Sequence, residues 1–74
     1  MISFAPLWET MSKKGVSTYA LKHKVKIGGG TYNRLKAGQP VSTTTIDMLC
    51  DYLDCEVQDI ICFTRIDGTQ KETP

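Results

Sequence analysis

Seven cationic side chains occupy the stretch between Thr10 and Ile46, and no acidic residue lies among them. From Asp47 onward the balance reverses, with seven acids against Arg65 and Lys71, so the net charge of +1 conceals a strongly polarised chain. A small protein polarised in this way turns its positive side toward a polyanion. The seven cations are Lys13, Lys14, Lys22, Lys24, Lys26, Arg34 and Lys36.

Catalytic and metal-binding chemistry is not expected from the remaining reactive side chains. Cys50, Cys55 and Cys62 show no C-x-x-C spacing, and the single histidine, His23, lies far away among lysines. Tetrahedral zinc needs four converging nitrogen or sulfur ligands, and a general base needs a partner nucleophile or carboxylate close by. We therefore expect no metal, no cofactor and no enzymatic activity. The cysteines are predicted to be buried, reduced thiols.

The length and hydropathy of the chain predict one small cytoplasmic domain. Its 74 residues suffice for a single domain with a thin core. We expect residues 1–66 to fold and residues 67–74 to form a flexible polar tail. No apolar run approaches the ~20 residues of a membrane span, and no charged leader precedes an apolar segment.

Helix signals recur along the chain and predict a compact, all-α, five-helix fold. Caps and breakers come from Pro6, Gly15, Ser17, Gly38 and either Ser42 or Thr43. The apolar stripe of Ile46, Leu49, Cys50 and Leu53 has helical spacing. The expected helices run over about Pro6 to Lys14, Thr18 to Lys24, Gly28 to Ala37, from the cap at Ser42 or Thr43 to Leu53, and Val57 to Cys62. The second and third are short and joined by a tight turn, which favours DNA as the polyanion.

Two sequence segments carry a family resemblance. One runs from Ser17-Thr-Tyr-Ala-Leu through Ile27 to Arg34-Leu-Lys-Ala-Gly38, and the other is Thr45-Ile-Asp-Met-Leu-Cys-Asp-Tyr-Leu-Asp-Cys followed by Asp59-Ile-Ile. Together they resemble the lambda-repressor-like, Cro-type (XRE) helix-turn-helix transcriptional regulators of bacteria and phages, in their small stand-alone branch. The resemblance covers about residues 4 to 63.

This resemblance implies duplex DNA binding, with the helix after the turn in the major groove. Arg34 is then expected to contact guanine and Asn33 adenine, each through two hydrogen bonds, while Thr31 meets a thymine methyl group or a phosphate. Gly29 and Gly30 share the groove-facing side. Phosphates are expected at Ser17 and Thr18, and at Lys36, Gln39, Ser42, Thr43 and Thr44.

Three features depart from the family pattern. Lys22 replaces a small residue between the two helices and must extend its charge to solvent, and Lys26 stands in the turn where many members have glycine. Gly28–Gly30 offers no side chain to a base, and each glycine lowers helix stability. The run has three possible explanations: close approach of the helix to DNA, a turn that stays irregular until DNA arrives, or weakened DNA binding. Specificity should therefore be modest.

Operators of this family are usually inverted repeats, which implies a weak homodimer on DNA. The expected self-association surface comprises Ile60, Ile61 and Phe63, with Ile2, Phe4 or Trp8. The alternative hypothesis is a protein-interaction module whose acidic face binds a partner, and an antitoxin-like role would combine both activities.

Overall fold

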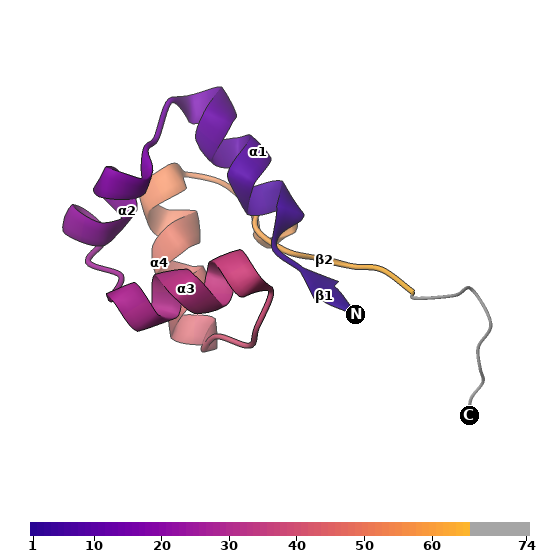
Figure 1. The fold of residues 1–74 in the computed structure, drawn as a ribbon. Helices are drawn as coiled ribbons and strands as arrows, with labels where there is room; N and C mark the ends of the chain where they lie inside the picture. Colours follow the sequence, from indigo (N-terminus) through magenta and orange to yellow (C-terminus); the bar gives the residue numbers. More distant parts are fainter. Residues whose placement is uncertain (66–74) are drawn as a thin grey trace.

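The computed structural model describes residues 1–65, so the predicted tail at 67–74 lies outside the described residues. Within these described residues, four α-helices enclose the core, and a short two-stranded sheet closes one end (Figure 1). The elements are β1 (Ile2–Ser3), α1 (Ala5–Lys14), α2 (Thr18–His23), α3 (Gly29–Ala37), α4 (Thr43–Leu53), the 3₁₀ turn η1 (Val57–Asp59) and β2 (Cys62–Phe63).

Local capping chemistry explains where the helices begin and end. Ser17 and Ser42 stand before α2 and α4, and their hydroxyls accept the backbone N–H groups of Ala20 and Thr45 at 3.2 and 3.3 Å. Gly15 and Gly38 end α1 and α3 in the left-handed conformation, with φ of 67° and 74°. Glycine adopts this conformation without steric cost. The predicted limits of these four helices are confirmed to within two residues.

The core forms where the inward faces of the four helices meet. Leu7, Leu21, Leu35 and Leu49 are fully or almost fully buried, and one comes from each helix. A polar contact supplements this packing, because the Thr10 hydroxyl of α1 donates to the Asp59 carbonyl of η1 at 2.8 Å. The apolar stripe predicted for α4 is confirmed. None of the helices described over residues 1–65 is long and apolar enough to cross a membrane.

The predicted fifth helix at Val57 to Cys62 is wrong, and the fold is not purely α-helical. Only one 3₁₀ turn forms, closed by a capping box in which the Glu56 N–H donates to the Asp59 carboxylate at 3.0 Å. The chain then extends, and β2 pairs with β1 in antiparallel register, Ile2 opposite Phe63. This pairing takes up backbone groups that a longer helix would need. Val57, at the start of this segment, is 52% exposed.

The cysteines are less enclosed than predicted. Cys50 and Cys55 are half-buried and Cys62 is exposed; all three are free thiols. The Cys55 N–H donates to the Cys50 carbonyl at 3.1 Å across the left-handed residue Asp54, which places the two side chains together at the end of α4. Burial raises the pKa of both thiols above the ordinary value.

Candidate nucleic-acid interface

The turn between α2 and α3 fixes how the two helices cross. The N–H groups of Lys24 and Val25 both donate to the Ala20 carbonyl, and the Ile27 N–H donates to the Leu21 carbonyl at 3.1 Å. Lys26 has a φ of 66°, a conformation in which an L side chain is strained. The family preference for glycine at this position therefore has a backbone cause. Ile27 is buried and anchors the turn to the core.

The exposed face of α3 contains the predicted base-reading residues. Gly29, Gly30, Asn33 and Arg34 are all exposed, whereas Leu35 is buried. The two glycines precede Asn33 and Arg34 by three to five residues, a spacing that places these four exposed residues on one side of the helix. Thr31 is half-buried and lies beside this face. The side chains expected to contact bases thus share a solvent-facing surface free of core packing.

Backbone geometry bears on the three possible explanations of the Gly28–Gly30 run. Gly28 is the extended residue before α3, with φ of −65° and ψ of 158°, and the helix is regular from Gly29 onward. A Cβ atom added at any of the three glycines would meet no atom within 4 Å. The free chain therefore has no packing reason for glycine there. The regular first turn also disfavours the hypothesis that this segment is irregular before DNA arrives.

Tyr32 of α3 contacts both α2 and α1. Its hydroxyl lies 3.1 Å from the Thr18 hydroxyl, and its ring meets Trp8 edge-on at a centroid distance of 6.2 Å. The Lys22 ammonium lies 4.8 Å from the centre of the same ring, so Lys22 reaches solvent over an aromatic face. Thr18, Trp8 and Tyr32 line a small hollow with Lys36. The hollow joins two of the predicted phosphate contacts, Thr18 and Lys36.

The remaining predicted phosphate contacts follow the end of α3. The Gln39 N–H donates to the Arg34 carbonyl at 2.8 Å, which fixes Gln39 directly after the helix. Ser42 caps α4, so its hydroxyl oxygen already accepts the Thr45 N–H; Thr43 and Thr44 are exposed. Ser17 has the same capping role on α2. The two serines therefore position helix ends in addition to any contact they make with DNA.

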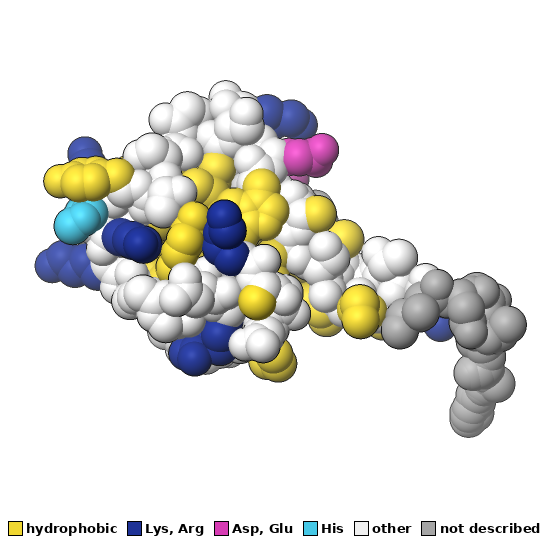
Figure 2. Space-filling model, viewed as in Figure 1, with side chains coloured by type: hydrophobic (Ala, Val, Ile, Leu, Met, Phe, Trp, Pro, Cys, Tyr) yellow, Lys and Arg dark blue, Asp and Glu magenta, His cyan; other side chains and the backbone are white. Residues whose placement is uncertain are grey.

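The cations fall into two groups with different surroundings. Lysine and arginine side chains surround the side formed by α2 and α3 in Figure 2, and acidic side chains appear in that view just at the edge. Lys13 and Lys14, by contrast, line a hollow with Asp54, Glu56 and Asp59. The basic stretch of sequence is thus not one continuous surface. We call the exposed cations of α2, the turn and α3 the basic face: Lys22, Lys24, Lys26, Arg34 and Lys36.

Some contacts of the basic face were not predictable from residue spacing. Tyr19 is exposed and stacks on His23 with ring centroids 4.1 Å apart. Lys22 over Tyr32 depends on how two helices cross, and helical periodicity carries no such information. Within residues 1–65, no group of three His, Cys, Asp or Glu side chains converges as a metal site would require.

A capped helix, a tight turn and a second helix with an exposed polar face define a helix-turn-helix protein. A model of the Cro/C1-type helix-turn-helix DNA-binding domain matches residues 6–65, and the chain belongs to this family. Its fold is similar to the crystal structure of the transcriptional regulator VanUg, with a TM-score of 0.77 and 28% identity, over 81% of this chain and 80% of that one. No curated protein matches the sequence.

Proposed function

We propose that this chain is a transcriptional regulator, repressor-like in action, that reads duplex DNA sequence by inserting α3 into the major groove. The observation that supports this most directly is the exposed α3 face, where Asn33 and Arg34 stand free of the core and Arg34 belongs to the basic face. Arginine pairs with two guanine acceptors and asparagine with adenine in that groove. We expect Thr18, Lys36 and Gln39, which are all exposed, to hold the phosphates on either side.

Selection from random duplexes followed by substitution of Arg34 tests the proposal. Arg34→Ala should lower affinity for the selected duplex by roughly 10- to 100-fold and relax preference at one base pair, because two hydrogen bonds to one base are lost. Asn33→Ala should do the same at a different base pair. Lys13→Ala is the matched control, since Lys13 lies beside acidic residues, and it should leave the base preference unchanged.

A second role, binding of a protein partner by the acidic side, has a specific observation in its favour. Met48, Tyr52 and Val57 are exposed apolar residues on or next to α4, and Asp47 and Asp51 accompany them on that helix. If Arg34→Ala and Asn33→Ala leave both DNA affinity and its salt dependence unchanged, α3 does not read DNA. The partner-binding role, including an antitoxin-like one, then becomes the better account.

A further inference from the structure

Two cysteine side chains meet where α4 ends. The Cys50 carbonyl accepts the N–H groups of Asp54 and of Cys55, the second at 3.1 Å, and Asp54 has the left-handed φ of 52°. This arrangement is a Schellman motif, in which the residue after the left-handed position packs its side chain against the last turn of the helix. Here the residue after it is Cys55, and the residue it packs against is Cys50. The backbone of the helix end therefore holds the two thiols together.

The two thiols are in direct contact. A hydrogen bond between them contributes to the pKa of each, and both side chains are half-buried against the core. A disulfide needs Cα atoms within about 7 Å of each other and side chains that point toward one another. Thiols already in hydrogen-bond contact, on residues joined by a backbone hydrogen bond, have side chains directed in this way. Closing the bond therefore requires side-chain rotation and no rearrangement of α4.

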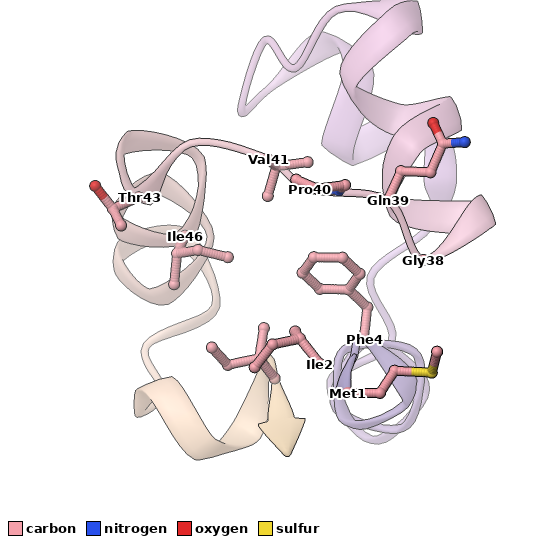
Figure 3. A pocket seen from close by; sticks show the side chains of 10 residues that line it. Met1, Ile2, Phe4, Gly38, Gln39, Pro40, Val41, Thr43 and Ile46 are labelled. Carbon is pink, nitrogen blue, oxygen red and sulfur yellow. The ribbon is translucent and has the colours of Figure 1, made fainter. Parts of the chain in front are cut away.

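Each thiol lines a hollow of its own. Cys55 lines one of about 260 Å³ together with Lys14. Cys50 lines another of about 340 Å³ with Ile46 and Asp47. Ile46 also lines the apolar groove drawn in Figure 3, where its side chain points inward, so the hollow at Cys50 borders that groove. Both hollows are several times larger than a water molecule, about 30 Å³, and hydrogen peroxide is larger than water by one oxygen atom. A small neutral oxidant therefore has a path to either sulfur.

The charges around the two thiols differ and favour Cys55 as the first to react. The thiolate, not the thiol, is the nucleophile. Burial raises the pKa of both thiols above the ordinary value, so the thiolate is a minor species of each at neutral pH. The negative charge of Asp47 raises the pKa of Cys50 further, and that of Asp59 acts on both thiols in the same direction. At Cys55 the ammonium group of Lys14 opposes these effects and lowers the pKa. Cys55 is therefore the better nucleophile of the pair.

We propose that Cys50 and Cys55 form a site of reversible oxidation, at which a peroxide converts the two thiols into an intramolecular disulfide. The Cys55 thiolate attacks one oxygen of hydrogen peroxide: an S–O bond forms, the O–O bond breaks, and the departing hydroxide takes up the thiol proton as water, which leaves a sulfenic acid. The Cys50 thiolate then attacks this sulfur; the S–S bond forms, the S–O bond breaks, and the second hydroxide leaves as water with the Cys50 proton. Two thiols and one peroxide thus give one disulfide and two waters.

The disulfide joins the last turn of α4 to the segment that leads into η1. That segment is already held to α1, because the Thr10 hydroxyl donates to the Asp59 carbonyl. Oxidation therefore ties α4 to the contact between α1 and η1 and should raise the melting temperature of the chain, since a cross-link restricts the unfolded state. Cys50 and Cys55 lie outside α2 and α3, so the oxidation is independent of the proposed reading of DNA.

Treatment of the full chain with hydrogen peroxide, followed by mass spectrometry, tests the proposal. The native chain should lose about 2 Da, the mass of two hydrogen atoms, and regain it with dithiothreitol. Chymotrypsin cleaves after Tyr52, between the two cysteines, so the two fragments of the oxidised chain should stay joined until the reductant is added. Cys62→Ser is the matched control, since Cys62 is an exposed thiol outside the pair. It should leave both results unchanged.

Single-cysteine variants in the Cys62→Ser background test the order of attack. Cys50→Ser and Cys55→Ser should each abolish the loss of mass. Dimedone should trap a sulfenic acid in Cys50→Ser at least about threefold faster than in Cys55→Ser, because a neighbouring cation favours the Cys55 thiolate alone. Lys14→Gln should slow disulfide formation about twofold for the same reason, whereas Lys36→Gln, on the basic face, should not. Thermal unfolding checks that the variants remain folded.

The native chain and Cys62→Ser decide the outcome even if a core cysteine variant unfolds, because neither changes the pair. A native chain that keeps its mass in peroxide overturns the proposal. So does oxidation that only joins two chains through Cys62, or that proceeds to a sulfinic acid at Cys55 without a disulfide. Faster trapping in Cys55→Ser than in Cys50→Ser would overturn the assignment of Cys55 as the attacking thiol.

Discussion

At the scale of single residues, the strained backbone of Lys26 offers a direct test of how the turn is built. Lys26 has a φ of 66° although it is not glycine. Lys26→Gly should raise the free energy of unfolding by roughly 0.5–1 kcal/mol, because glycine removes the steric cost of the left-handed conformation. The higher backbone entropy of glycine in the unfolded chain offsets part of this stabilisation. Urea denaturation monitored by circular dichroism measures this change.

Asp54 provides the control, since it also has a positive φ, of 52°. Aspartate tolerates the left-handed conformation better than lysine does, so Asp54→Gly should gain less stability than Lys26→Gly. Equal gains at both positions would show that unfolded-state entropy, and not strain at Lys26, governs the result.

At the scale of elements, the glycines around α3 divide into two groups with opposite expected effects. Gly29 and Gly30 are helical with open space at the position of a Cβ. Gly29→Ala and Gly30→Ala should each raise the free energy of unfolding by about 0.5 kcal/mol. Gly38 has a φ of 74°, so Gly38→Ala should lower it by about 1 kcal/mol. Urea denaturation of the three variants measures the expected increases and the expected decrease in the free energy of unfolding.

Gly29→Ala and Gly30→Ala also distinguish two explanations of the glycine run, close approach of α3 to DNA and weakened DNA binding. If α3 approaches DNA closely at its N-terminus, Gly29→Ala and Gly30→Ala will stabilise the fold and still weaken binding to the selected duplex. If the run instead reflects weakened DNA binding, the stabilised variants will bind at least as well as the native chain. A loss of stability at Gly29 or Gly30 would contradict the open space described there.

The helix limits were predictable because they depend on local chemistry. Ser17, Ser42 and Gly38 act within a few residues of their own positions, and their effects are visible in the sequence. The two strands were not predictable, because each has only two residues and leaves no alternating pattern. They exist through pairing between residues as distant as Met1 and Thr64. The predicted fifth helix failed for the same reason, since β2 took part of its residues.

In the candidate interface, too, features set by local sequence were predictable and features set by tertiary packing were not. The exposed face of α3 follows from helical periodicity, so the accessibility of Asn33 and Arg34 is predictable from the sequence alone. The contact of Lys22 with Tyr32, and the position of Lys13 and Lys14 beside acidic residues, depend on how helices cross. The amount of charge is therefore predictable from the sequence, while the surroundings of each cation in the folded chain are not.

At the scale of the whole molecule, the surroundings of the cations predict which of them set the salt dependence of DNA binding. Each cation that neutralises a phosphate contributes about −0.9 to the slope of log K against log salt concentration. Lys22→Gln and Lys36→Gln should therefore each make the slope shallower by about one unit, because both side chains lie on the basic face. Fluorescence anisotropy of a labelled duplex, titrated at several salt concentrations, measures the slopes.

Lys13→Gln and Lys14→Gln remove the same charge outside the basic face and serve as controls. These two lysines lie beside Asp54, Glu56 and Asp59, where a phosphate backbone would be repelled, and they complement the C-terminal end of α1. Their substitution should leave the slope unchanged within error. If all four variants flatten the slope equally, DNA senses only the net charge of the chain, and an oriented basic face plays no part in binding.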